Sequence, residues 1–161
     1  MGLCLCVSPF FSTFKESFKI YKVMATFKLA IQDYLTINEV TKTLKLKELE
    51  IEEIKNILKL KAAVRAVAKK YEDFLNDLKE SLITPDVAEA LKKQQAKEDL
   101  TDAEKQSIED ANVKFTAVHD AELTKNVEIE IEPLDELVIA KMIKYSDLSI
   151  EGAELLYQLI E

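Results

Sequence analysis

Glycine is almost absent from this chain: of 161 residues only Gly2 and Gly152 are glycine. Phosphate-binding loops, nucleophile elbows and dinucleotide-binding turns all depend on glycine, because only glycine lets the backbone approach a ligand closely. The long stretch between the two glycines therefore lacks the means to build these sites. The sequence favours helices that pack against one another and predicts no catalytic site.

Cysteine is also scarce, and both cysteines, Cys4 and Cys6, lie near the N-terminus. Two residues apart in extended chain, they point the wrong way for a disulfide bond. We therefore expect the rest of the chain to be stabilised by packing alone. No stretch approaches the roughly 20 apolar residues of a transmembrane helix.

Basic residues are fewer than acidic ones, and the formal net charge is −8. Residues 1–23 carry +2, so the remainder is strongly acidic and repels nucleic acid and anionic lipid. We therefore expect no nucleic-acid partner. One group of basic residues interrupts the acidic sequence, and we interpret it as a solvated helix face: Lys59, Lys61, Arg65, Lys69 and Lys70.

The first 23 residues differ in composition from everything after them, being apolar up to Phe11 and then basic and aromatic. Gly2, Cys4 and Cys6 are candidates for lipidation, although position 6 is cysteine where an acylation signal has serine or threonine. The simplest interpretation is that Met24 is the real or sufficient start. Residues 1–23 would then be an upstream readthrough or a loosely ordered arm.

A helical stripe of apolar residues dominates the middle of the chain. Its members are Ile57, Val64, Ala68, Tyr71, Leu75, Leu78 and Leu82. They follow the three- and four-residue spacing of a packed helix seam, with Lys61 in the one position that is skipped. No proline or glycine interrupts residues 51–82, so we expect one continuous helix about 45 Å long. A helix of this length needs a partner helix, and we expect its seam to make protein contacts.

The partner helix follows in the sequence. Thr84-Pro85 ends the long helix and starts a short polar helix over 86–98. Thr101 and Glu104 form a capping box that opens a third helix over 102–123. Its seam has the same spacing and consists of Ile108, Ala111, Phe115, Val118 and Glu122. We therefore predict an antiparallel helical hairpin over about 46–124, with the short helix near its tip.

The two ends of the body predict a small lobe. Residues 26–31 and 127–132 alternate apolar and polar side chains, and Pro133 ends the second pattern, so we expect two short strands that pair with each other. We expect a helix over 37–44 after a capping box at Thr36 and Glu39, and C-terminal helices from Asp135 and Ser149. The fold class is thus mainly α with a minor β element (α+β). Residues 24–161 form a single domain, in which 126–161 supply the second strand and the last helices.

Two sets of side chains are candidates for a binding or catalytic site. Glu128, Glu130 and Glu132 would form an acidic row on one strand face; we interpret it as a solvated face, with contact to a basic partner as one alternative and a metal site as another. His119, the only histidine, stands beside Asp120, but neighbours in sequence do not face each other on a helix. We interpret it as a surface or boundary residue. We assign no catalytic, cofactor-binding or metal-binding residue.

Four segments together resemble small, mostly uncharacterised proteins of tailed bacteriophages, some encoded among virion genes. These segments are LTINEV at 35–40, LKLKAAVRAVAKKYEDF at 58–74, VEIEIEPL at 127–134 and LSIEGAELLYQLIE at 148–161. Where such proteins carry an Arg-rich helix end and a Tyr-Gly turn, this chain has Leu82-Ile-Thr-Pro-Asp and an extra polar helix. The resemblance implies a phage protein and transfers no catalytic residue.

The leading hypothesis is a non-enzymatic phage structural or virion-assembly protein that contacts other virion or assembly proteins, or itself, through its helices. It would reside in the virion or in the cytoplasm of the infected bacterial cell. One alternative is a membrane-tethered adaptor acylated at Gly2, Cys4 and Cys6. Others are a phage-encoded adaptor or inhibitor directed at the host, and a metal-dependent hydrolase built from scattered carboxylates.

Overall fold

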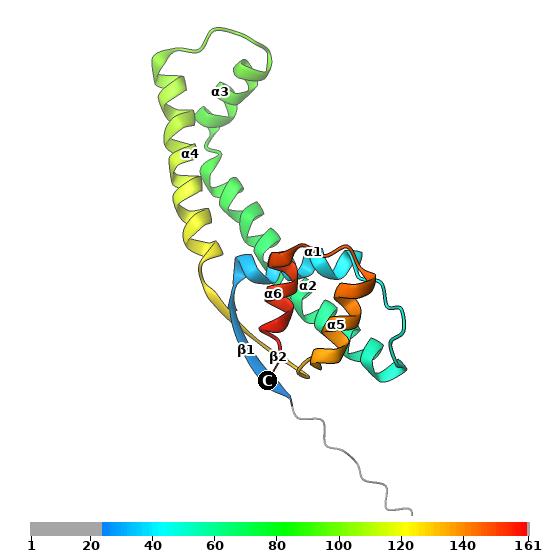
Figure 1. The fold of residues 1–161 in the computed structure, drawn as a ribbon. Coiled ribbons are helices and arrows are strands. Elements are labelled where there is room, and N and C mark those ends of the chain that lie inside the picture. Colours follow the sequence, from blue (N-terminus) through cyan, green and yellow to red (C-terminus); the bar gives the residue numbers. More distant parts are fainter. Residues whose placement is uncertain (1–23, 161) are drawn as a thin grey trace, which may run out of the picture.

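The computed structural model describes residues 24–160, which form six helices and one two-stranded antiparallel sheet (Figure 1). Strand β1 (Ala25–Ala30) leads directly into helix α1 (Ile31–Thr43), and α2 (Ile51–Leu82) follows. Then come α3 (Pro85–Gln95), α4 (Asp102–Leu123), β2 (Asn126–Ile131), α5 (Glu136–Tyr145) and α6 (Ile150–Tyr157). The predicted fold class, mainly helical with a minor sheet, is confirmed.

The molecule consists of a compact lobe and an arm that protrudes from it (Figure 1). The lobe contains the sheet, α1, the first half of α2, α5 and α6, and the arm contains the rest of α2 with α3 and α4. Helix α3 continues outward from the end of α2, and α4 returns along both of them to the lobe. The predicted hairpin, with its short helix at the tip, is therefore present.

The sheet pairs the predicted strands in an apolar register. Phe27 lies opposite Ile129 and Leu29 opposite Val127, so the apolar side chains of both strands share the face that packs on the core. On the other face, Lys28 lies opposite Glu128. A two-stranded sheet is marginal on its own, and here the helices of the lobe cover its apolar face.

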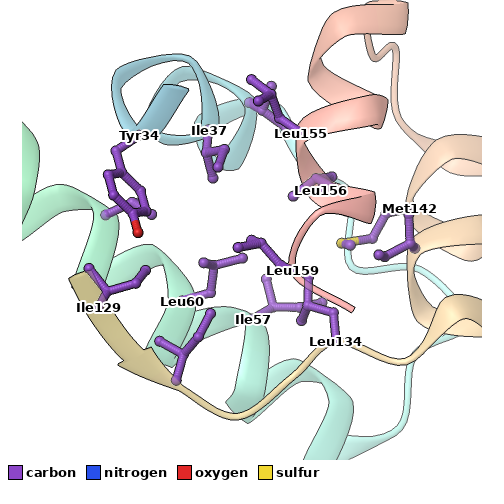
Figure 2. Close-up of a cluster of buried hydrophobic side chains, with 14 of the residues drawn as sticks. Tyr34, Ile37, Ile57, Leu60, Ile129, Leu134, Met142, Leu155, Leu156 and Leu159 are labelled. Atoms are coloured by element: carbon purple, nitrogen blue, oxygen red, sulfur yellow. The ribbon is translucent and has the colours of Figure 1, made fainter. Parts of the chain in front are cut away.

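The core of the lobe is one cluster of buried side chains (Figure 2). Tyr34 and Ile37 of α1, Leu60 and Val64 of α2 and Ile139 of α5 are almost completely buried. The C-terminal segment completes the cluster with Leu155, Leu156 and Leu159; in Figure 2, Leu155 lies toward α1 and Leu159 lies beside Leu60 and Ile57. One apolar face of α2 thus holds together elements from both ends of the chain.

Helix α1 starts earlier than the sequence predicted. We expected a cap at Thr36, but the helix begins at Ile31, where the Ala30 amide donates to the Asp33 carboxylate at 3.3 Å. The Thr36 hydroxyl instead donates to the Gln32 carbonyl within the helix, at 3.1 Å. Burial of Ile31 and Tyr34 outweighs the local capping signal, since both side chains must reach the core.

The other helix ends follow their sequence signals. Thr84, Thr101, Asp135 and Ser149 each cap the helix that follows, accepting a hydrogen bond from a backbone amide two or three residues on. The chain has no glycine to end α3, so Lys97 takes the left-handed conformation, with φ 57°, and the Glu98 amide donates to the Lys93 carbonyl at 3.0 Å.

Gly152 provides a direct test of the packing between α6 and α1. A Cβ atom at this position would lie 2.6 Å from Val40 Cγ2, well inside contact distance. Helix propensity alone predicts that Gly152→Ala stabilises the protein by about 1 kcal/mol. We expect the steric overlap with Val40 to outweigh this gain, so that Gly152→Ala lowers the free energy of unfolding by about 1–3 kcal/mol, as measured by urea unfolding. In a Val40→Ala background, the same substitution should be neutral or stabilising; equal effects in both backgrounds would contradict the packing.

Candidate functional site

The arm is the least buried part of the described chain. Beyond Tyr71, the seam side chains of α2 are only partly covered, and no residue of α4 is fully buried. At the far end, Val87 and Ala90 of α3 are buried against α4. Because the arm has only two layers, both edges of its apolar seam remain open to solvent.

The predicted seam residues divide between the lobe and the arm. Ile57 and Val64 are 2% and 0% exposed and lie in the lobe's own core, where no partner can reach them. Leu75 and Leu78 lie in the arm and are partly exposed, as is Phe115 of α4. Leu60 and Val67 are also buried, although neither belongs to the predicted seam. Each lies three residues after one seam residue and four residues before another, and this spacing could have identified both as buried.

His119 rather than Val118 packs at the base of the arm. The His119 ring lies 5.6 Å from the Phe115 ring and 6.1 Å from the Tyr71 ring, between centroids, whereas Val118 is 42% exposed. A straight α-helix drifts about 20° per heptad from a strict seam. This drift places the residue four after Phe115 in the contact, instead of the residue three after it.

The neighbouring carboxylate fixes the orientation of the His119 ring. Asp120 Oδ1 lies 2.8 Å from His119 Nδ1, so the two adjacent side chains do meet, contrary to our expectation. A carboxylate can only accept a hydrogen bond, and Nδ1 therefore carries the proton. Asp120 itself is exposed, and the pair lies on the surface of the arm. This contact holds the ring in its place between Tyr71 and Phe115.

An apolar pocket of about 260 Å³ lies where α2 bends into α3. Side chains from three helices line it, among them Leu82 of α2, Val87 of α3 and Ile108 of α4. Ile83, between α2 and α3, is 50% exposed at its edge. The pocket leaves part of the apolar surface between these three helices uncovered.

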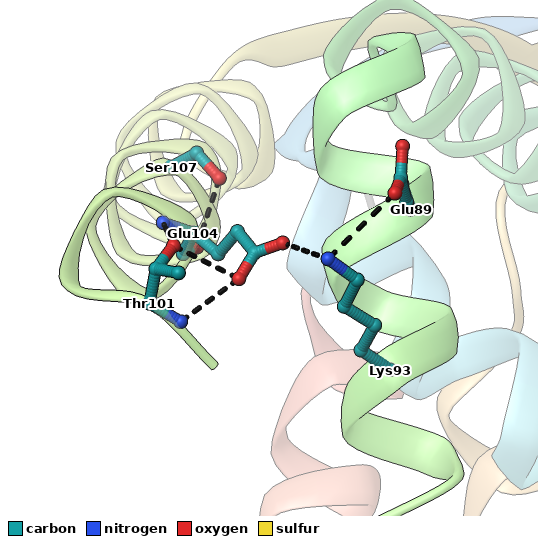
Figure 3. Close-up of polar contacts among 5 residues, drawn as sticks. All are labelled: Glu89, Lys93, Thr101, Glu104 and Ser107. Carbon is teal, nitrogen blue, oxygen red and sulfur yellow. Dashed lines mark hydrogen bonds and ion pairs between the residues drawn. The ribbon is translucent and has the colours of Figure 1, made fainter. Parts of the chain in front are cut away.

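A polar cluster ties α3 to the start of α4 (Figure 3). The Thr101 amide donates to Glu104 Oε2 at 2.8 Å, and the Glu104 amide donates back to the Thr101 hydroxyl at 3.2 Å. Lys93 of α3 donates to the other Glu104 oxygen and also lies 3.7 Å from Glu89. The capping box was predicted from the sequence, but the ion pair that joins it to α3 was not.

This cluster lowers the pKa of Glu104 to about 2, chiefly through the hydrogen bond from Lys93 and then through the two bonds from Thr101. A carboxylate whose pKa falls on folding stabilises the fold above its usual pKa of 4.5, and that contribution is lost as the pH falls toward about 2. The contacts between α3 and the first turn of α4 should therefore weaken over this range of pH.

We expect amide hydrogen exchange in the first turn of α4 to accelerate as the pH falls from 4.5 toward about 2, beyond the intrinsic pH dependence of exchange. Glu104→Gln should remove this extra dependence, because the variant has no carboxylate to protonate. Glu89→Gln is the matched control, since Glu89 also contacts Lys93 but is largely exposed. An unchanged pH dependence in Glu104→Gln would contradict the role of this carboxylate.

The predicted acidic row on β2 is shorter than expected. Glu128 and Glu130 lie on the outer face of the sheet, and Glu128 pairs with Lys28 across the strands at 3.3 Å. Glu132 follows the end of the strand; its side chain is only 11% exposed and lies 3.4 Å from Lys59 of α2. Pairing with lysines thus leaves Glu130 as the row's only carboxylate without an ion pair among residues 24–160.

Three further predictions concern sites outside this geometry. The lipidation candidates Gly2, Cys4 and Cys6 lie outside the described residues. Within residues 24–160, no group of three or more histidine, cysteine, aspartate or glutamate side chains could hold a metal ion. No helix in that part of the chain combines the length and the apolar character needed to cross a membrane.

The chain matches no protein-family model, no curated protein and no solved structure.

Two buried tyrosines provide a matched test of the junction between lobe and arm. The Tyr34 hydroxyl lies 2.9 Å from the Phe27 carbonyl and 3.1 Å from the Val127 carbonyl, whereas the buried Tyr71 hydroxyl has no hydrogen-bond partner among residues 24–160. We expect Tyr34→Phe to lower the free energy of unfolding by about 1–2 kcal/mol. Tyr71→Phe should be neutral or stabilising, because it removes an unsatisfied polar atom. Equal losses in urea unfolding would contradict this assignment.

Proposed function

We propose that this protein is a non-enzymatic structural or virion-assembly protein of a tailed bacteriophage and that it acts through protein contacts made by its helices. The observation that carries this proposal is the arm. It extends away from the lobe, and its apolar seam is only partly covered by its own helices. A protruding element of this kind suits contact with another subunit.

The exposed apolar side chains support a role in contact. Ile83, between α2 and α3, is 50% exposed, and Val113 on α4 is 59% exposed. The apolar pocket lies beside Ile83. Burying such side chains against a partner is favourable by about 25 cal/mol per Å² of apolar surface removed from water. The proposed partners are other virion or assembly proteins, or further copies of this chain.

The viral assignment is supported by the resemblance of four sequence segments to small proteins of tailed phages. All four segments contribute residues to the lobe and its core, through α1, α2, β2 and α6. The extra polar helix, in which the chain differs from those proteins, is α3 at the tip of the arm. The proposal therefore places the shared part of the sequence in the lobe and the distinctive part where a partner would be selected.

Quantitative mass spectrometry of purified particles from the encoding phage tests the proposed function. We expect the chain to be present at a fixed ratio to the major capsid protein through successive purification steps, or to be abundant in capsid precursors if it acts during assembly. A host protein of similar abundance serves as the control for contamination. Absence from both particles and precursors, despite abundance in the infected cell, would contradict the proposal and favour a host-directed adaptor.

A further inference from the structure

The acidic and basic side chains of this protein are separated in space. Residues 54–71, which form most of the lobe half of α2, contain six basic residues and no acidic one. Residues 72–123, which form the arm, contain fourteen acidic and six basic residues, a formal charge of −8. The net charge of the whole chain, −8, therefore resides in the arm, while the base of α2 is strongly basic.

The basic residues of α2 border an exposed apolar row. Leu58, Ala62 and Ala66 are exposed and recur every four residues, so they form one ridge of the helix. Lys61, Arg65 and Lys69 run alongside this ridge. We call these six residues the α2 face.

The described part of the chain supplies no ion-pair partner for the cations of the α2 face. Lys61, Arg65 and Lys69 form no ion pair with any residue among 24–160. They also line a groove of about 700 Å³ between α1 and α2, where Glu72 marks the far end and Glu39 is paired with Lys42. An unpaired cationic row beside an apolar ridge is complementary to an acidic amphipathic helix.

Helix α4 carries the matching pattern on its outer side. Val113, Ala117 and Ala121 are exposed and recur every four residues, as the ridge of the α2 face does. Acidic side chains predominate beside this ridge where the α2 face has basic ones, and Lys114 is the exposed basic residue among them. We call the following six exposed residues the α4 face: Glu109, Asp110, Val113, Ala117, Asp120 and Ala121.

The carboxylates of the α4 face remain available. Glu109 forms no ion pair among residues 24–160, and Asp110 accepts only a neutral hydrogen bond from the Gln106 amide, at 2.8 Å. Asp120 accepts a hydrogen bond from the imidazole of His119 and has no ion pair with a lysine or arginine of the described chain. The α4 face thus presents its negative charge to solvent.

We propose that the α4 face of one copy of this protein docks on the α2 face of another copy. Ridges formed by residues four apart interdigitate at a crossing angle of about −50°, the commonest mode of helix packing. The small alanine side chains on both ridges let the two helix backbones come close. The flanking cations and carboxylates then fix the register. The proposal rests on the proposed function and names a partner and a surface for it.

Charge and apolar character together favour a protein helix as the occupant of the α2 face. Nucleic acid would satisfy the cations, but it would leave the apolar ridge uncovered and would be repelled by the acidic arm. Both faces are exposed within a single copy, so their contact joins two copies. Since the two faces differ, the contact is heterologous, and repeated copies form either a closed ring or an open chain.

Sedimentation velocity over a range of protein concentrations tests this contact with paired charge reversals. Wild type should self-associate, and high salt should weaken the association. We expect Arg65→Glu/Lys69→Glu and Glu109→Lys/Asp110→Lys each to weaken it by at least about tenfold, because attraction becomes repulsion. An equimolar mixture of the two variants should associate again, since each supplies the face that the other lacks. Circular dichroism verifies that each variant is folded.

Lys45→Glu/Lys47→Glu is the matched control, because it changes the net charge by the same amount outside both faces and should associate as wild type does. A monomeric wild type, unchanged association of either reversed pair or a monomeric mixture would overturn the proposal. Duplex DNA binding that is lost in Arg65→Glu/Lys69→Glu would also overturn it, by assigning the α2 face to nucleic acid. A monomer present at a fixed ratio in phage particles would overturn only the self-association and leave the proposed function standing.

Discussion

The lobe depends on the buried side chain of Tyr34. Its ring lies fully buried in the core between α1, α2 and the sheet, and its hydroxyl proton is shared between a carbonyl oxygen of β1 and one of β2. Burial raises the pKa of this phenol, which stays a neutral donor. A two-stranded sheet has little stability alone. Tyr34 fixes both strands to the first helix and orients the apolar face of the sheet toward the core.

The arm is stabilised by different interactions from those of the lobe. In the lobe, α2 is stabilised by side chains such as Leu60 and Val64, which are almost fully excluded from water. In the arm, the same helix relies on partly covered side chains, on aromatic contacts around His119 and on the polar cluster that joins α3 to α4. Local opening should therefore begin in the arm, where the buried apolar area per residue is smallest. The lobe can serve as the fixed base from which the arm makes contacts.

The sequence predicted best what local signals determine. The caps at Thr84 and Thr101 mark real helix starts, because a capping side chain acts within one turn and needs no tertiary contact. The pairing of β1 with β2 was also predictable, since the two apolar alternating segments had only each other as partners. These features give the fold class and most element boundaries.

The features that the sequence did not predict depend on tertiary contacts. The cap expected at Thr36 lost to the burial of Ile31 and Tyr34, which no local motif indicates. His119 replaced Val118 in the arm because a straight helix drifts from a seam counted in heptads. The pairing of Lys93 with Glu104 joins two helices through the geometry of the tip, and the α2 and α4 faces became recognisable only once the exposed side of each helix was known. The sequence showed the charges but not which way they point.

Helix α2 runs through the lobe and into the arm without a break, and this continuity has a mechanical consequence. With no proline or glycine between Ile51 and Leu82, the helix offers no hinge where the arm leaves the lobe. It acts as a lever, one end of which is packed in the core beside Tyr34 while the other end carries α3 and α4. A force applied at the tip is therefore transmitted as torque to the packing of the lobe, and a load on the lobe tilts the arm.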